Sequence, residues 1–232
     1  MLSVFETIKN IIFPRTCIGC EEKNEVLCDS CLSKCVFRDD IGCPLCGSPT
    51  LLSRLCDLCR DSSDLEVLLS LYDYEQPYIN TLLHLAKYKG VLEAGERLGE
   101  IMAKRLKQNH YLELLQLSDA LIIPVPLHSN RLVERGYNQS ELIAESFAQA
   151  MGMTSKSVLT RTKDTVSQTT LTPLERLQNT KNAFSASLDA RGRDCVLIDD
   201  VATTGQTLNA CAQALKTAGA GRVIAITVAR GA

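Results

Sequence analysis

The sequence lacks both a strong excess of charge and a Gly-Lys-Ser/Thr loop. Its 232 residues carry a formal net charge of −2, which excludes binding to polyanions through bulk charge. The missing loop excludes the P-loop ATPases, although an apolar run followed by two aspartates would otherwise suit them. Gly219 and Gly221 lack the third glycine of a dinucleotide-binding fingerprint, and they precede an apolar run rather than a helix. Two common classes of nucleotide-binding protein are therefore excluded.

No segment of the sequence has the features of an export signal or of a membrane span. Apolar side chains recur at helical spacing from Leu2 to Ile12, but Glu6 and Lys9 interrupt this stripe. It is also too short to cross a bilayer. We therefore expect an N-terminal helix that packs on the body of a cytoplasmic protein.

Cysteine, in contrast, is abundant and unevenly distributed. Eleven cysteines are present, and nine of them come before residue 60. Because no export signal accompanies them, metal ligation is favoured over disulfides, a redox dithiol or an iron–sulfur cluster. Two C-x-x-C pairs supply the four thiolates of a tetrahedral Zn²⁺ site. Eight cysteines form four such pairs and predict two structural zinc ions: Cys17, Cys20, Cys28, Cys31, Cys43, Cys46, Cys56 and Cys59.

The four pairs can be grouped in sequence order or cross-braced. Grouping neighbouring pairs closes shorter loops and is favoured, but the sequence leaves the cross-braced arrangement open. Residues 17–66 contain ten acidic and five basic residues, which opposes contact with a nucleic-acid backbone. We expect a structural or protein-contact module in which zinc replaces a core that so short a segment cannot build. The remaining Cys35, Cys195 and Cys211 are expected to be small buried hydrophobic residues.

From residue 67 onward, apolar runs alternate with amphipathic segments. This alternation predicts an α/β fold with a mostly parallel sheet and helices on both of its faces. The chain then divides into an N-terminal helix and zinc-binding cysteine module, 1–66, and an α/β domain, 67–232. Strands are expected at 67–74, 120–126, 157–159, 195–198 and 222–229, and helices at 79–90, 92–108, 140–152 with Ser140 as cap, from Thr172, and from about 206 to Gly219.

One stretch, VLIDDVATTGQT at 196–207, combines two acids with a hydroxyl-rich loop. Open parallel sheets bind ligands at the carboxyl ends of their strands, and Asp199 and Asp200 are expected at such an end, after a buried strand at 196–198. Free amides at the start of the next helix and threonine hydroxyls donate to a phosphate. Carboxylates would repel a phosphate unless they face a ribose diol or Mg²⁺. The stretch therefore suggests a sugar phosphate, with an ordinary strand–turn–helix and solvated aspartates as the alternative.

The same stretch resembles the 5-phosphoribosyl-1-pyrophosphate (PRPP) loop of type I phosphoribosyltransferases. The resemblance implies that Asp199 and Asp200 hold the ribose hydroxyls. The order of the zinc head, PVPLHSNRLVERGYNQS and this loop is similar to that of the ComF family, which includes the GntX proteins, over nearly the whole chain. ComF proteins are associated with DNA uptake in natural transformation. The residues implied to hold the 5′-phosphate are Ala202, Thr203, Thr204, Gly205, Gln206 and Thr207.

Two arginines follow the strand that ends near Pro126. Arg131 and Arg135 are four residues apart and suit a diphosphate, because each guanidinium donates a fork of hydrogen bonds. In the family this position carries the pyrophosphate-binding loop, so residues 127–130 are implied to supply amides. A solvated basic turn is the alternative. His128 is interpreted as structural rather than as a general base.

Further cations are implied on two other segments. Lys87 stands where family members often carry a lysine and is implied to reach the diphosphate, with a surface lysine as the alternative. The hydroxyl-rich residues 160–171 resemble the loop that closes over PRPP, and a plain surface linker is the alternative. In the closed loop, Arg161 and Lys163 would meet the leaving group.

The resemblance implies displacement at ribose C1, in which a nucleophile enters as Mg²⁺-bound pyrophosphate leaves. No base-binding segment can be identified, because aromatic residues are only 5% of the chain. Three functions stay open: a phosphoribosyltransferase with an unknown acceptor, a PRPP- or nucleotide-sensing protein of the DNA-uptake apparatus, and a factor that handles single-stranded DNA. If the two acids were buried in an internal ion pair, or turned away from any cavity, the ligand hypotheses would fail.

Overall fold

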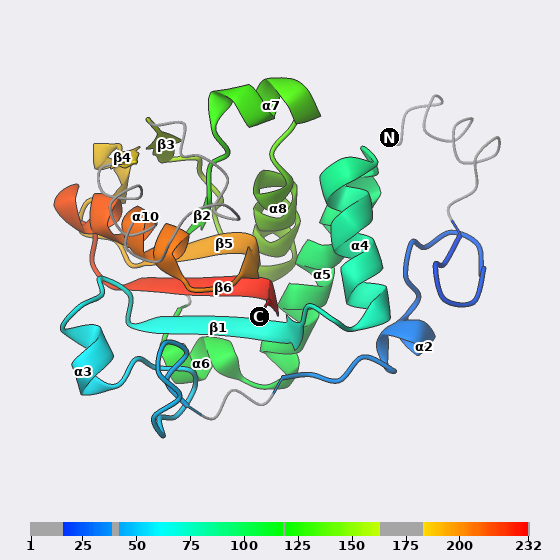
Figure 1. Cartoon of the computed structure of the whole chain (residues 1–232), viewed down its shortest axis with the longest axis horizontal. Helices are drawn as coiled ribbons and strands as arrows, with labels where there is room; N and C mark the ends of the chain where they lie inside the picture. The colour runs from blue at the N-terminus through cyan, green and yellow to red at the C-terminus, as the bar shows by residue number, and fades with distance from the viewer. Residues whose placement is uncertain (1–15, 39–41, 118, 163–182, 232) are drawn as a thin grey trace.

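The structure is a computed structural model that describes residues 16–38, 42–117, 119–162 and 183–231 (Figure 1). The expected N-terminal helix, the helix from Thr172, Lys163 and most of the segment 160–171 lie outside the described residues. In the part of the chain that is described, no helix is both long and apolar enough to cross a membrane.

Four parallel strands form the central sheet, in the spatial order β1-β6-β5-β2. Their side chains are buried along nearly their whole length. Continuous apolar strands of this kind need cover on both faces, as the sequence predicts. The strands are β1 (Val67–Asp73), β2 (Leu121–Pro124), β5 (Cys195–Ala202) and β6 (Val223–Arg230).

Helices cover both faces of this sheet (Figure 1). On one face, α4 (Pro77–Tyr88), α5 (Leu92–Gln108) and α8 (Gln139–Met151) share an apolar core with side chains of all four strands. On the other face, α10 (Gln206–Thr217) packs its buried stripe against the alternate strand residues. The α/β architecture with a mostly parallel sheet is thus confirmed.

Helices α5 and α8 approach each other closely at Gly99. A β-carbon placed on Gly99 would lie 2.4 Å from the carbonyl oxygen of Ile143 and 2.8 Å from the amide nitrogen of Phe147. Both are backbone atoms of α8, so no side-chain rotation would relieve the clash. Glycine at this position therefore sets the distance between the two helices. It also fixes the position of α8, whose first turn donates hydrogen bonds to Asp199 and Asp200, here called the acid pair.

Several local expectations were wrong. The N-cap of α8 is Asn138, whose side chain accepts from the Ser140 amide, and Ser140 lies inside the helix. The strand expected at 157–159 begins only at Leu159 and pairs antiparallel in a separate two-stranded sheet. The elements that the sequence did not predict are all short: α2 (Asp29–Leu32), α3 (Asp57–Arg60), α6 (Tyr111–Leu115), α7 (Ser129–Arg135), β4 (Phe184–Ala186), which is the partner of β3 (Leu159–Arg161), and the 3₁₀ helix η2 (Leu188–Ala190).

The cysteine-rich head packs directly on the α/β body. Cys17 and Leu27 belong to the apolar core shared with α4 and α5, whereas Cys43 and Leu55 belong to the core shared with α10. Helices α2 and α3, one from each half of the head, are well separated in Figure 1. The head is therefore held against two different parts of the body, and the boundary between 1–66 and 67–232 stays a prediction.

Candidate phosphoribosyl site and zinc centres

The acid pair lies inside strand β5 rather than beyond its end. The expected strand 195–198 continues through Asp199 and Asp200 to Ala202, because β6 keeps pairing with it as far as Arg230. The turn to α10 is correspondingly short. Gly205 ends it in the left-handed region, with a φ of 76°, and is the N-cap of α10. The loop is therefore fixed between a strand and a helix within three residues, Thr203 to Gly205.

Asp199 is held by donors from two directions. Ser140 Oγ, in the first turn of α8, donates to Asp199 Oδ1 at 2.8 Å, and the Asp200 amide donates to the same oxygen at 3.0 Å. Burial, reinforced by the neighbouring Asp200 charge, raises the pKa of Asp199 to about 7 despite these donors. A carboxyl with such a pKa exchanges a proton near neutral pH and suits general acid–base chemistry.

Asp200 is buried and ion-paired. Lys87 Nζ, in the last turn of α4, lies 2.6 Å from Asp200 Oδ2, and Gln139 Nε2 donates to that oxygen at 3.2 Å. Burial disfavours the charged form of Lys87, but the attraction of Asp200 outweighs it and the pKa of Lys87 is raised. This ion pair is not sequestered from ligand, because both of its partners line a cavity.

A cavity of about 300 Å³ brings the predicted site residues together. Segments far apart in the sequence contribute to it: the end of α4, the segment after β2, the starts of α8 and α10, and the end of β5. Of the predicted PRPP-binding residues, only Lys163 is missing from its lining, because it lies outside the described residues. The predicted residues that line the cavity are Lys87, Arg131, Arg135, Arg161, Asp199, Asp200, Ala202, Thr203, Thr204, Gly205, Gln206 and Thr207.

The start of α10 provides donors at one end of this cavity. The first amides of a helix have no partner within the helix, and the helix dipole adds positive potential there. Thr203, Thr204 and Thr207, which carry hydroxyl groups, line the cavity at this end. Gln206 Oε1, at the same helix start, is buried and has no hydrogen-bond partner among the described residues. The combination suits a phosphate monoester attached to a sugar.

Arg131 and Arg135 lie on a short helix, α7, and not in the basic turn that was the alternative. His128 caps this helix, because its Nδ1 accepts from the Asn130 amide at 3.2 Å, in line with a structural role. Arg135 Nη1 donates to Gln139 Oε1 at 3.2 Å, and its guanidinium lies 5.2 Å from the centre of the Tyr88 ring. Gln139 thus connects Arg135 to Asp200.

Ser140 is the site residue that the sequence did not identify. Its hydroxyl is buried and bonds Asp199, but its position in the sequence is typical of a helix cap. Its partner is 59 residues away along the chain. Only the packing of α8 against β5 brings the two together, so no local pattern could have revealed the contact.

The eight C-x-x-C cysteines gather in two clusters, in the sequential grouping that was favoured. Within each cluster the sulfur atoms all lie within 4.8 Å of one another. Four sulfurs held at about 2.3 Å from one Zn²⁺ ion lie about 3.8 Å apart, and the measured separations of 3.6 Å for Cys20–Cys28 and 3.5 Å for Cys46–Cys56 agree with this. The clusters are Cys17, Cys20, Cys28 and Cys31, and Cys43, Cys46, Cys56 and Cys59.

The electrostatics of the first cluster fit a bound cation. Burial alone would raise the pKa of Cys17, but backbone amides of Cys28, Gly19 and Cys20 outweigh it and lower the pKa to about 6. Burial and the neighbouring cysteines raise the pKa of Cys31 to about 12. These opposite shifts show mutual repulsion among the thiolates, which a Zn²⁺ ion bound between them would relieve.

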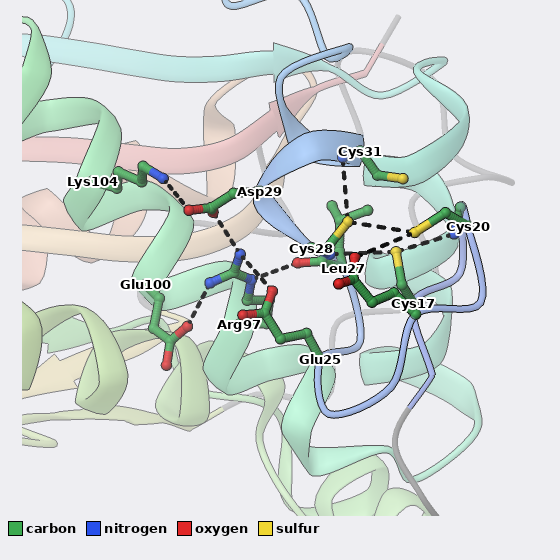
Figure 2. Close-up of polar contacts among 12 residues, drawn as sticks. Cys17, Cys20, Glu25, Leu27, Cys28, Asp29, Cys31, Arg97, Glu100 and Lys104 are labelled. Carbon is green, nitrogen blue, oxygen red and sulfur yellow. Dashed lines mark hydrogen bonds and ion pairs between the residues drawn. The ribbon is translucent and has the colours of Figure 1, made fainter.

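An ion-pair network fixes the first cluster to α5 (Figure 2). Asp29, next to the zinc-ligand candidate Cys28, accepts from Lys104 Nζ at 2.7 Å and from Arg97 Nη2 at 2.9 Å. Arg97 Nε also donates to the Leu27 carbonyl at 2.9 Å. These cations lower the pKa of Asp29, chiefly through the Lys104 hydrogen bond. The first cluster is therefore anchored on the helical face of the body.

The three remaining cysteines are buried, as predicted. Cys35 lies in the apolar core of the head and α5, and Cys195 and Cys211 lie in the core under α10. Burial raises the pKa of each of these thiols. They behave as small apolar side chains rather than as nucleophiles.

Comparison with known proteins now identifies the family. Residues 90–232 match the phosphoribosyl transferase domain, and residues 8–60 match the double zinc ribbon domain. The DNA utilization protein YhgH of Escherichia coli O157:H7 is 34% identical over 85% of this chain and 87% of its own length. Competence protein ComFC of Bacillus subtilis is 30% identical over 83% of this chain and 78% of its own. The chain belongs to the ComF family.

A more distant relative of this ComF-family chain is also similar along most of its length. Competence protein F of Haemophilus influenzae is 28% identical over 88% of the chain and 91% of its own length. The two matched domains together cover both cysteine clusters and all of the cavity lining except Lys87. The two four-cysteine clusters accordingly fit two structural zinc ions in a double zinc ribbon.

Proposed function

We propose that this chain binds PRPP, together with Mg²⁺, in the cavity at the carboxyl end of β5, and transfers its phosphoribosyl group to an acceptor. The observation that carries the proposal is the meeting of an acid pair, a threonine-rich helix start and four basic side chains around one cavity of about 300 Å³. The loop from Ala202 to Thr207 would hold the 5′-phosphate, and Asp199 and Asp200 the ribose hydroxyls. Arg131, Arg135 and Lys87 would face the diphosphate, with Lys163 as a further candidate.

In the absence of a ligand, Lys87 and Asp200 neutralise each other's charge through their ion pair. When a diphosphate enters, Lys87 gains a second anionic partner, and Asp200 gains ribose hydroxyl donors. Mg²⁺ would neutralise charge on the leaving diphosphate when it is bound. The protein's own contribution is then positioning and charge stabilisation, with Asp199 able to take a proton from the acceptor.

The names of the relatives suggest where such an activity would act. One is called a DNA utilization protein and two are called competence proteins. We propose that the chain serves DNA uptake or the use of imported DNA, in the cytoplasm. A phosphoribosyl donor site would link this process to nucleotide metabolism.

A PRPP sensor with little turnover is the second candidate function. The observation that favours it is the lining of the cavity, where none of the described residues is aromatic. A nucleobase acceptor is commonly recognised by stacking on an aromatic ring. The described lining therefore suits the binding of PRPP better than the binding of a base. Both functions need the same PRPP site, and they differ only in whether pyrophosphate is released.

Thermal unfolding with and without PRPP tests the site that both functions share. We expect millimolar PRPP with Mg²⁺ to raise the Tm by roughly 5–10 °C, the shift for a ligand near 100 times its Kd. The double variant Asp199→Asn/Asp200→Asn replaces the charged acceptors of the diol with neutral amides, which bind hydroxyls and Mg²⁺ more weakly, and should abolish the shift. Asp189→Asn is the control, because Asp189 is exposed and lies outside the cavity. If the wild-type Tm does not move, both ligand hypotheses are rejected.

Two further assays separate the functions. Release of pyrophosphate in the presence of a panel of nucleobases identifies a transferase, whereas binding without release identifies a sensor. A gel shift with single-stranded DNA at increasing salt tests the DNA-handling alternative, because contacts to phosphates weaken steeply with salt. Strong, salt-dependent DNA binding without any PRPP effect would replace the proposed function.

A further inference from the structure

The second zinc cluster lies against the loop assigned to the 5′-phosphate. Its first knuckle is Cys43 to Cys46, and Leu45 at the tip points at Gly205. A β-carbon built on Gly205 would be 3.4 Å from Leu45 Cδ2 and 3.1 Å from Leu68 Cδ2. The Leu45 side chain of the zinc knuckle therefore lies beside Gly205, on the side where a β-carbon would project. Leu45 stays 40% exposed, so it lies near the surface and not deep in a core.

A second contact joins the knuckle to the strand beside the loop. Arg230 Nη2 donates to the carbonyl oxygen of Pro44 at 2.8 Å. Arg230 is the last residue of β6 and pairs with Ala202, the last residue of β5 before the loop. The residue after it, Gly231, donates its amide to the Ala202 carbonyl at 2.9 Å. The knuckle therefore bonds Arg230, which pairs with the last residue before the loop, and lies beside Gly205, which ends the loop.

A third contact reaches the helix on the other side of the loop. Just beyond the last cysteine of the cluster, Ser63 Oγ and the Asp64 amide both donate to Asn209 Oδ1, at 2.8 and 2.9 Å. Asn209 lies in the first turn of α10. Cys43 of the cluster also shares an apolar core with Leu208 of that turn. The strand end, the loop and the helix start therefore all lie against residues 43–64, the zinc cluster and the residues that follow it.

We propose that the second zinc centre supports the phosphate loop, with Leu45 as its positioning residue, so that zinc and the phosphoribosyl ligand bind cooperatively. A segment as short as 43–59 has too small a core of its own to fix the knuckle, so without metal only its contacts with the body would hold it. When zinc holds the knuckle, Leu45 restricts Gly205 and the amides that follow it. Such preorganisation lowers the cost of ordering the loop around a phosphate. The inference rests on the proposed PRPP site and adds a dependence on one particular metal centre.

The first zinc centre provides an internal comparison. It is anchored on α5 through Asp29, Arg97 and Lys104 (Figure 2), and none of these residues lines the cavity. Coupling between binding sites is reciprocal, so a ligand that gains affinity from one zinc ion must also retain that ion more tightly. At equilibrium with a chromogenic chelator, ribose 5-phosphate is therefore expected to reduce the transfer of one zinc ion per chain and to leave that of the other unchanged.

The role of Leu45 is tested by calorimetry, in which ribose 5-phosphate is titrated into the full zinc-loaded chain and the dissociation constant is measured. We expect Leu45→Ala to weaken binding roughly tenfold while two zinc ions per chain are retained. Leu45→Met should restore most of the affinity, because it refills the contact. Leu58→Ala is the matched control, a leucine of the same module that is 84% exposed. If Leu45→Ala loses zinc, the milder Leu45→Val is used for the same comparison.

The outcomes distinguish this inference from the proposed function. If the wild type binds neither ribose 5-phosphate nor PRPP, the proposed function fails and the inference fails with it. If the wild type binds, and Leu45→Ala and Leu45→Val bind equally well with zinc in place, the proposed function stands and the inference is overturned. Equal protection of both zinc ions by ligand, or of neither, also overturns it. Weaker binding by Leu45→Ala, rescue by Leu45→Met and protection of a single ion support it.

Discussion

At the scale of single residues, the two neighbouring acids of β5 have different environments. Asp200 has a fixed cation in Lys87, whereas Asp199 is held by hydroxyl and amide donors and stands beside a like charge. Neighbouring carboxyls with different surroundings can take different roles in one site. The sequence shows the pair but not this division, because Lys87 and Ser140 come from helices far away in the chain.

The raised pKa of Asp199 makes stability depend on pH. The folded chain keeps a proton on this carboxyl up to about pH 7, whereas the unfolded chain releases it near the ordinary value of 3.8. The folded state therefore binds more protons in this window, and stability falls as the pH rises through it. Because Asn keeps a neutral acceptor for Ser140, Asp199→Asn should raise the Tm of the ligand-free chain by a few degrees at pH 8 and by less at pH 5.

The control residue for this prediction is Asp189, whose pKa is shifted in the opposite direction to that of Asp199. Lys156 donates to Asp189 and lowers the pKa of that carboxyl, so the contribution of Asp189 to stability is present above its unfolded pKa and is lost in acid. Asp189→Asn should not raise the Tm at pH 8. Thermal unfolding of both variants at the two pH values checks the sign, and a loss of stability in Asp199→Asn at pH 8 would contradict the assigned pKa.

At the scale of elements, the sequence predicts long, periodic segments well and short ones poorly. The helix over 92–108 and the stop at Gly152 agree with the structure, because apolar spacing and a glycine at the C-cap are local signals. Helix α7 has seven residues and buries none of them, so it has no apolar stripe to detect. The three-residue strands β3 and β4 exist only through their pairing with each other.

The approach of α5 to α8 gives a prediction at this scale. Gly99→Ala would place a methyl group 2.4 Å from a backbone oxygen and should destabilise the fold by about 1–3 kcal/mol, a loss of roughly 2–12 °C in Tm. Gly95→Ala is the matched control on the same helix, since it meets only the Leu142 side chain, at 3.1 Å. There the helix propensity of alanine, about 1 kcal/mol better than glycine, should offset the contact. Equal Tm values for the two variants would contradict this packing.

At the scale of the whole molecule, the chain is a phosphoribosyltransferase-like domain whose two four-cysteine clusters pack on different parts of the body. Composition and spacing predict both parts, because cysteine pairs and alternating apolar runs can be recognised in the sequence. The contacts between the two parts cannot be recognised in the sequence. The contacts of Leu45 with Gly205 and of Ser63 with Asn209 join residues about 150 positions apart, and only the folded chain brings them together.

A crystal structure grown with PRPP and Mg²⁺ at saturating concentration, with zinc counted in the same protein, tests the account most directly. The account predicts a 5′-phosphate against Thr203, Thr204 and Thr207, a ribose diol on Asp199 and Asp200, and two zinc ions per chain. A cavity left empty at saturating ligand, or a ligand bound without contact to either acid, would contradict it.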